Sequence, residues 1–191
     1  MERGEVAQRT MNTLLHVLEA YAEFYRAVPD ERIRQAGVRC LERFLKVMYN
    51  QSERRLEVFY DKNYRSLLDM QSYGHDIEAS WLMWDAVEAL IPEAERAPYR
   101  DMCITLAQAT CERAFTDHGM ENEIVEGEVE HTRIWWVQAE TILGIQDFRA
   151  DEKAFQIMEQ FRGRCGRRTD KGLFIIQPSQ PEHPIYQNLL S

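Results

Sequence analysis

The sequence predicts an all-α fold of helical hairpins, with short β-hairpins in the loops between them. One observation is the helical spacing of apolar residues in six segments of the chain. The other is an internal repeat, in which segments 16–20 and 75–79 share a histidine, a glutamate and an alanine at equivalent positions. The aligned glutamates are Glu19 and Glu78, and a third copy of the repeat keeps only its glutamate, Glu140. Successive glutamates are 59 and 62 residues apart. Such hairpins must stack on neighbours, into an open solenoid or a closed α/α toroid.

The first predicted hairpin joins a helix at Thr10 to Ala27 with a helix at Glu31 to Tyr49. Pro29 breaks the first helix, and Asp30 can cap the second. The apolar residues at helical spacing are Leu14, Val17, Leu18, Tyr21, Phe24 and Tyr25 in the first helix, and Ile33, Val38, Leu41, Phe44, Leu45 and Met48 in the second.

The loop after this hairpin contains a segment, Arg55 to Tyr60, that alternates like a short strand. The turn residues at 61–63 can lead it back through Leu67 and Leu68 as a β-hairpin. The second pair of helices is predicted at His75 to Ile91, which stops before a proline, and at Pro98 to Phe115.

The last part of the predicted repeat begins with a polar, acidic loop at 121–130, which has a possible strand at Asn122 to Glu126. A fifth helix is predicted at Arg133 to Gln146 and a sixth at Asp151 to Gly163.

Composition limits the classes of function. The chain has 191 residues, 45% of them hydrophobic, which is enough for one core. A net charge of −9 argues against nonspecific binding of nucleic acid. No apolar run approaches the length of a membrane span, and the first residues lack the pattern of a secretory signal. The four cysteines, Cys40, Cys103, Cys111 and Cys165, are spaced unlike a metal or redox motif. We therefore expect a cytoplasmic protein with reduced thiols.

Chemistry-bearing residues gather at the starts of three predicted helices. His75 and Glu78 are three apart and share a helix face, next to Gly74, which we interpret as a hinge. Asn12 and His16 are four residues apart near the start of the first helix, and Trp135-Trp136 opens the fifth. In a toroid the first helix of each pair lines the inside, so these groups would meet at one mouth. This pattern predicts a pocket that grips a polar ligand and moves protons.

Three segments together resemble the cellobiose 2-epimerases, a branch of the N-acylglucosamine 2-epimerase family. They are Ser72-Tyr73-Gly74-His75-Asp76-Ile77-Glu78-Ala79-Ser80-Trp81-Leu82, Met11-Asn12-Thr13-Leu14-Leu15-His16-Val17-Leu18-Glu19-Ala20-Tyr21 and Trp135-Trp136-Val137-Gln138-Ala139-Glu140. The resemblance runs from about Thr10 to about Gly163. The other branch of the family tends to have a different string after its Gly-His, which favours enzymes acting on disaccharides.

The resemblance implies an (α/α)6 barrel and reversible epimerisation at C2 of the reducing-end glucose of cellobiose and related β-1,4-disaccharides, giving glucosyl-mannose. His75 would be one of two catalytic acid/bases that exchange the C2 proton, and Glu78 could orient or charge-stabilise its imidazole. Asn12 and His16 would hydrogen-bond the sugar and help to stabilise the enediolate. Trp136, with Trp135, would form an aromatic wall against a sugar face. No metal or other cofactor is implied, and no partner other than the sugar.

Two departures from the family matter. The chain supplies three of the six hairpins of a complete toroid, so it is similar to a C-terminal half. We expect residues 1–165 to form a partial barrel and residues 166–191 a divergent tail, in which His183 does not match the context of the second catalytic histidine. We interpret the chain as a fragment with little or no epimerase activity, whose exposed apolar helix faces could allow self-association.

Other readings of the same residues stay open. A glycoside hydrolase on this toroid would need two carboxylates, but Asp76 and Glu78 diverge on a helix. A noncatalytic helical-repeat scaffold and a metal site of His16, His75 and Glu78 are further alternatives. Glu19 and Glu140 are expected to hydrogen-bond between neighbouring helices of the repeat.

The remaining aromatic and basic groups are assigned to packing and solvent. We expect Trp81 and Trp84 to belong to the core, and His118 and His131 to be solvated in loops.

Overall fold

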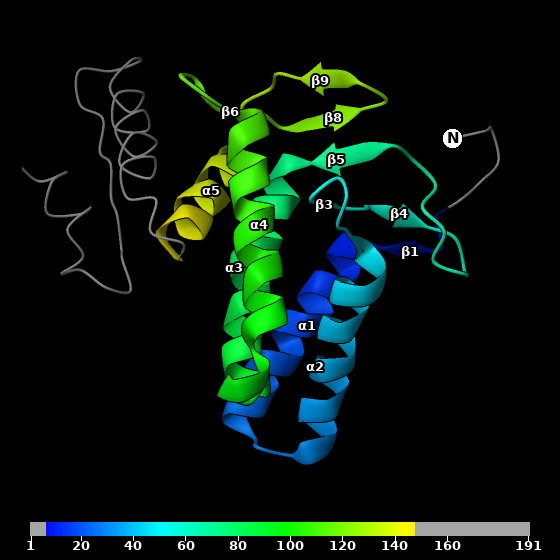
Figure 1. Ribbon diagram of the computed structural model, residues 1–191, viewed down its shortest axis with the longest axis vertical. Helices are drawn as coiled ribbons and strands as arrows, with labels where there is room; N and C mark the ends of the chain where they lie inside the picture. Colours follow the sequence, from blue (N-terminus) through cyan, green and yellow to red (C-terminus); the bar gives the residue numbers. More distant parts are fainter. Residues whose placement is uncertain (1–6, 148–191) are drawn as a thin grey trace, which may run out of the picture.

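The computed structural model describes residues 7–147, and over this range the chain is mainly helical. Two long hairpins stand side by side, α1 (Met11–Ala27) with α2 (Glu31–Arg43) and α3 (Tyr73–Leu90) with α4 (Ala97–Ala114) (Figure 1). The last described helix, α5 (Trp135–Asp147), packs on α3. Helices α1, α3 and α5 form a row in which each packs on the next, so the predicted repeat is confirmed for two hairpins and for the first helix of the third.

Local hydrogen bonds explain where the first helices begin. The Thr10 side chain accepts from the backbone N–H of Thr13 at 3.2 Å, and that of Asp30 accepts from the backbone N–H of Arg32 at 2.8 Å. The predicted helix Glu31 to Tyr49 is α-helical only as far as Arg43. It continues as a π-helical turn, η1 (Phe44–Met48), before the chain becomes extended. A 3₁₀ turn, η2 (Glu93–Glu95), joins α3 to α4.

The loops at one end of the hairpins carry short antiparallel strands (Figure 1). β1 (Arg9–Thr10) pairs with β4 (Phe59–Tyr60), β2 (Tyr49–Asn50) with β3 (Arg55–Leu56), β6 (Phe115–Thr116) with β7 (Gly119–Met120), and β5 (Met70–Ser72) with β8 (Glu123–Val125), which also pairs with β9 (Glu128–Glu130). The predicted strand within 122–126 is confirmed by β8.

The predicted continuous strand Arg55 to Tyr60 is wrong, because its two ends pair with different partners. Arg55–Leu56 forms a hairpin with Tyr49–Asn50, which directly follows η1. Phe59–Tyr60 pairs instead with the segment before α1. The predicted turn at 61–63 does reverse the chain, but only an isolated bridge between Tyr60 and Ser66 follows it.

Buried apolar residues form two clusters that meet along α3. The larger lies between α1, α2, α3 and α4, and the smaller between α3, α4 and α5. The predicted apolar face of α1 is too wide, since Val17 and Phe24 are exposed while Leu15 and Leu18 are fully buried. The predicted sixth helix and the predicted tail at 166–191 lie outside the described residues. Within residues 7–147, no helix combines the length and apolar character needed to cross a membrane.

The contact of α3 with α5 is close because Gly144 has no side chain. A Cβ atom there would lie 2.8 Å from Cγ1 of Ile77 and 2.9 Å from its backbone oxygen. The backbone atom cannot move without shifting α3, so this glycine sets the separation of the two helices.

We expect Gly144→Ala to lower the free energy of unfolding by about 1–3 kcal/mol through overpacking, despite the higher helix propensity of alanine. The matched control is Gly37→Ala in α2, where the new Cβ would meet chiefly a methyl group of Leu90, which can rotate away. Urea denaturation measures both variants. An equal or smaller loss for Gly144→Ala than for Gly37→Ala would contradict this account of the α3–α5 contact.

Candidate functional site

The first turn of α3 holds His75 between a serine and a tryptophan from another helix. Oγ of Ser72, the last residue of β5, lies 2.7 Å from Nδ1 of the imidazole. The ring of Trp136, at the start of α5, has its centroid 5.0 Å from that of the imidazole, with the planes tilted by 53°. His75 is therefore fixed at one ring nitrogen by a hydrogen bond and along the ring by an aromatic contact.

Gly74 makes room for this tryptophan. It lies within α3, and a Cβ atom on it would be 2.6–2.9 Å from atoms of Val137 and Trp136. The interpretation of Gly74 as a hinge is wrong, because its backbone is part of the helix. Its function in the fold is to allow close approach of α5.

His16 connects α1 to the same region. Its Nε2 lies 3.9 Å from Oε1 of Glu78 on α3, and its Nδ1 lies 3.0 Å from Oε2 of Glu19. The side chain of His16 is half exposed, whereas that of Glu78 is only 12% exposed. We expected Glu78 to orient His75; instead the Glu78 side chain contacts His16, and Ser72 contacts the imidazole of His75.

Burial moves the two central titratable groups toward neutrality. The pKa of Glu78 rises to about 7, first because burial disfavours the carboxylate and then because Glu140 is negative, while His16 opposes the rise. Burial, and the proximity of His16, lower the pKa of His75. Near pH 7 the site thus combines a neutral imidazole with a carboxyl group that can either take or give a proton.

Glu140 lies on α5 and accepts a hydrogen bond at 2.9 Å from Nε1 of Trp81 on α3. The expectation that it bonds between neighbouring helices is confirmed. The same expectation is wrong for Glu19, whose contact with His16 lies within α1. Trp81 and Trp84 are partly buried and packed against the core, as predicted.

The predicted sugar-binding residues differ in exposure. Trp135 is 74% exposed at the start of α5, whereas Trp136 is partly buried against His75. Asn12 is partly buried on α1, one turn before His16, and its Oδ1 has no hydrogen-bond partner among the described residues. Of the two tryptophans, only Trp136 is in ring contact with a proposed catalytic group.

Two of the alternative sites lose support from this geometry. Asp76 is 1% exposed and accepts hydrogen bonds from Gln71 and the backbone of Leu56, so it cannot form a hydrolase pair with Glu78 across an open cleft. Among residues 7–147, no group of three or more histidine, cysteine or acidic residues is placed to hold a metal ion.

The two loop histidines that we expected to be solvated, His118 and His131, differ in their contacts. His118 is exposed, whereas His131 also lies 3.1 Å from a carboxylate oxygen of Glu121. Arg133 contacts the same carboxylate, so Glu121 is buried in an ion-pair cluster.

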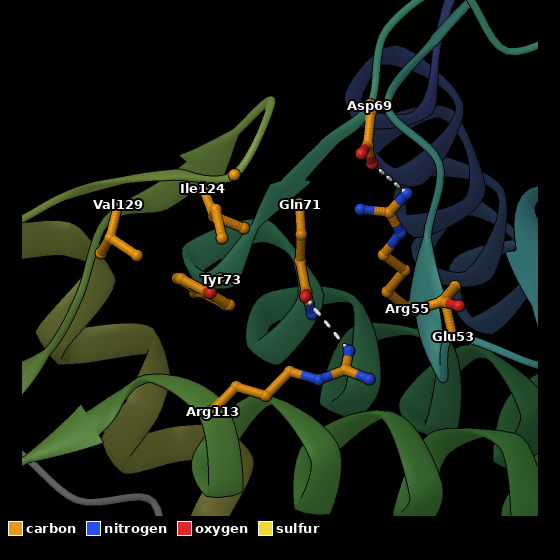
Figure 2. Close-up of a pocket in the computed structure, with 9 residues that line it drawn as sticks. Glu53, Arg55, Asp69, Gln71, Tyr73, Arg113, Ile124 and Val129 are labelled. Atoms are coloured by element: carbon orange, nitrogen blue, oxygen red, sulfur yellow. Dashed lines mark hydrogen bonds and ion pairs between the residues drawn. The ribbon is translucent and has the colours of Figure 1, made fainter.

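A cavity of about 660 Å³ opens elsewhere, between the β5–β8–β9 sheet and the end of α4 (Figure 2). Its walls include Arg55, Gln71, Tyr73 and Arg113, and it contains none of the predicted site residues. Since Gln71 faces this cavity and the next residue, Ser72, bonds to His75, the cavity and the histidine lie on opposite sides of β5.

The stacked hairpins, with polar and aromatic groups at one end of α1, α3 and α5, define about half of an (α/α)6 barrel. The proteins with which the chain shares this arrangement are cellobiose 2-epimerases. That of Eubacterium cellulosolvens is 40% identical over 159 residues, which cover 75% of this chain and 39% of the relative. That of Dictyoglomus turgidum is 37% identical over 143 residues and 37% of its length. No family model matches the chain.

Solved structures agree with this similarity. The cellobiose 2-epimerase of Bacillus thermoamylovorans B4167 superposes with a TM-score of 0.77 at 34% identity, over 85% of this chain and 42% of that one. A sugar epimerase from a ruminal bacterium gives a TM-score of 0.82 at 31% identity, over 91% and 46%. The resemblance inferred from the sequence is confirmed, and the chain spans less than half the length of these relatives.

A shorter similarity is of another kind. The replication restart protein PriA of Treponema pallidum is 52% identical over 46 residues, which are 24% of this chain and 7% of PriA. A match to so small a part of PriA carries no function over to this chain.

Two residues of the site were missed as functional candidates. Ser72 was noted only as part of the resembling segment, although its spacing of three residues before His75 allows the hydrogen bond that forms. Glu140 was assigned to the repeat alone, but its charge also raises the pKa of Glu78.

We expect Glu140→Gln to lower the pKa of Glu78, because the substitution removes a like charge next to a buried carboxyl group. Carbon-13 NMR of the glutamate carboxyl groups during a pH titration measures the change. The control is Glu19→Gln, which should lower the pKa less because the charge of Glu19 is the weakest of the influences on Glu78. An unchanged pKa in Glu140→Gln would disprove the coupling.

Stability should depend on pH through the same carboxyl group. Glu78 keeps its proton up to about pH 7 in the folded chain and up to about its ordinary value of 4.5 when unfolded. The folded state therefore binds more protons between these values, so this group makes the free energy of unfolding fall as the pH rises from 4.5 to 7. Denaturation across this range should show a shallower fall for Glu78→Gln. Identical pH profiles would show that the pKa of Glu78 is not raised by folding.

Proposed function

We propose that this chain provides one half of a cellobiose 2-epimerase site, which acts at C2 of the reducing-end glucose of cellobiose and related β-1,4-disaccharides. The observation that carries the proposal is the placement of His75 between Ser72 and Trp136, beside the His16–Glu78 pair. Similarity to the cellobiose 2-epimerases supports it over 75% of the chain. The proposed catalytic residues are His75 and Glu78, and the proposed sugar-binding residues are Asn12, His16, Trp136 and Trp135.

His75 is suited to remove the C2 proton. In the tautomer in which Nδ1–H donates to Oγ of Ser72, the other ring nitrogen, Nε2, keeps its lone pair free for the substrate. Burial lowers the pKa of this imidazole, so it is neutral at pH 7 and able to accept a proton. The proton leaves C2 of the open-chain sugar for Nε2, and its bonding electrons form the C1=C2 double bond of an enediolate.

The His16–Glu78 pair is suited to the oxygen side of the same step. As the C2 proton leaves, negative charge develops on the former carbonyl oxygen at C1. Glu78, with a pKa of about 7, can give that oxygen a proton, and His16 can stabilise the charge by a hydrogen bond. Return of a proton to the opposite face of C2, while Glu78 takes back the proton on the C1 oxygen, regenerates the carbonyl group with the mannose configuration. A second acid/base on that face must supply this proton.

The aromatic wall is proposed for Trp136. Its ring lies next to the imidazole, so a sugar stacked on the indole would place its carbon atoms near His75. The exposed Trp135 can contact only a part of a ligand that extends to the surface of α5.

We propose that further barrel hairpins, from this or another polypeptide, cover one side of α1. Val17 and Phe24 on this helix are 40% and 53% exposed, and Val28, the residue after its end, is 49% exposed. In a closed ring each inner helix has an inner neighbour on both sides, whereas among the described residues α1 has only α3. Self-association of two copies through the same face is the alternative use of this surface.

We propose a cytoplasmic location because buried cysteines of this chain are not paired in disulfides. Cys40 and Cys103 are free and buried within the described part of the chain. Such cysteines suit a reducing compartment.

The test of the proposed function uses cellobiose in deuterated water. We expect the chain to exchange the C2 proton of cellobiose for deuterium, because His75 can remove this proton without a second acid/base. Glucosyl-mannose should form far more slowly, because epimerisation needs a second acid/base on the opposite face. Proton NMR of the sugar measures both reactions.

His75→Asn should reduce the exchange by a factor of about 100 or more, because the general base is lost. The matched control is His118→Asn, which changes an exposed histidine of a loop and should leave the exchange unchanged. Exchange that survives in His75→Asn would refute the role of His75. Epimerisation at roughly 1 per second or more would refute the expectation that this chain is nearly inactive.

A further inference from the structure

The residue after His75 has a carboxylate that the proposed chemistry does not use. Asp76 is 1% exposed, and each of its oxygens accepts a hydrogen bond from a different strand. Oδ1 accepts from the backbone N–H of Leu56 in β3 at 3.2 Å, and Oδ2 accepts from Nε2 of Gln71 in β5 at 2.8 Å. The first turn of α3 is thereby tied to two loop strands.

Gln71 extends these bonds to α4. Its Oε1 accepts a hydrogen bond at 3.1 Å from Nη1 of Arg113, near the end of α4 (Figure 2). Arg113, Gln71 and Asp76 therefore form a continuous chain of donors and acceptors in one direction, from guanidinium to amide to carboxylate. An apolar side chain at 71 or 76 would leave buried polar partners unpaired.

Two pairs of side chains connect β5 to α3 at the same junction. Gln71 bonds to Asp76, and the next residue along the strand, Ser72, bonds to the residue before Asp76, His75. Because neighbouring residues of a strand point to opposite sides, the two pairs lie on opposite faces of the junction. A shift of β5 against α3 that breaks the first pair also moves Ser72 away from Nδ1 of His75.

The carboxyl group of Asp76 is buried at an electrostatic cost. Burial raises the pKa of this carboxyl group to about 7, against the opposing effects of Gln71, Leu56 and the positive Arg55 and Arg113. A buried carboxyl group that serves only to fill space is replaceable by an apolar one. Here both oxygens are used to hold backbone segments next to the candidate base.

We propose that the Arg113–Gln71–Asp76 chain positions His75: it fixes β5 against the start of α3, so that Ser72 holds the imidazole with Nε2 toward the sugar. Asp76 and Gln71 are positioning residues and do not touch the substrate. The inference rests on the proposed function for its catalytic meaning, but the geometry of the imidazole can be tested by itself.

The chain of hydrogen bonds offers a swap experiment. In Asp76→Asn the side chain can still accept from Leu56 N–H, but its new amide donor faces the amide donor of Gln71. In the double variant Gln71→Glu/Asp76→Asn the middle bond is reversed. The carboxylate at 71 accepts from both Arg113 and the new amide at 76, and the carbonyl at 76 still accepts from Leu56. Every polar atom is paired again, with the same total charge.

Two measurements on the 191-residue chain are compared across these variants. Nitrogen-15 NMR of the histidine rings reports the tautomer of His75 and its hydrogen bond to Ser72. Proton NMR in deuterated water reports the exchange of the C2 proton of cellobiose. In Asp76→Asn we expect a changed His75 tautomer signal and an exchange rate lowered roughly tenfold to a hundredfold, because a small displacement of a catalytic group is costly. In the double variant both should return to within about twofold of the wild type.

A stability control separates positioning from general loss of folding. Met102→Ala removes a buried side chain of α4 and should lower the unfolding midpoint without changing the His75 signals. The proposal is overturned by unchanged His75 signals in Asp76→Asn, or by a double variant that folds but does not restore them. It is also overturned by a change of the same kind in Met102→Ala. If the wild type shows no exchange while the His75 signals follow the swap, the proposed function fails and the positioning of His75 stands.

Discussion

The close approach of α5 to α3 is the constraint on which the rest of the site depends. The approach is possible because each helix has a glycine that faces the other helix. Gly144 of α5 lies against Ile77, and Gly74 of α3 lies against Trp136. At this separation the indole of Trp136 reaches the imidazole of His75, and Glu140 reaches Trp81. The aromatic wall, the candidate base and the charge that raises the pKa of Glu78 are therefore consequences of one packing contact.

Two neighbouring acidic residues of α3, Asp76 and Glu78, have different roles because their surroundings differ. Asp76 and Glu78 both have a pKa of about 7, and in both the largest cause is burial. Asp76 has two fixed hydrogen-bond donors and no access to solvent, so it holds structure. Glu78 faces His16, with 3.9 Å between Oε1 and Nε2, and retains some exposure, so it can exchange a proton. The residue type alone would not separate these two roles.

Much of the fold could be predicted from the sequence because it depends on local patterns. Helical periodicity and the cap Asp30 located the starts of the first helices closely, and the repeated glutamates indicated the length of one hairpin unit. The strands were harder to predict, because Arg55–Leu56 and Phe59–Tyr60 take their partners from segments distant from one another in the chain. No local pattern distinguishes one continuous strand from two short ones with different partners.

The sequence predicted which residues belong to the candidate site better than it predicted which of their side chains contact one another. Spacing along a helix placed His75 and Glu78 on one face, but it does not say which side chain of another helix comes nearest. Thus Glu78 pairs with His16 on α1, and Glu140 bonds to Trp81. Both depend on the distance between helices, which the residues at the contact set, such as Gly144. Gly74 was correctly singled out for an incorrect reason, since its missing side chain matters and its backbone freedom does not.

The outermost strand of the loop sheet has a consequence for how copies of this protein meet in solution. β9 exposes Glu128 and Glu130 along an edge whose backbone groups could otherwise recruit a strand from another molecule. An identical edge brought alongside would place carboxylates against carboxylates, so sheet extension into fibres is disfavoured electrostatically. Crowded solutions of this acidic chain should therefore favour contacts between helices over growth by strand addition, and salt, by screening that repulsion, should weaken the preference.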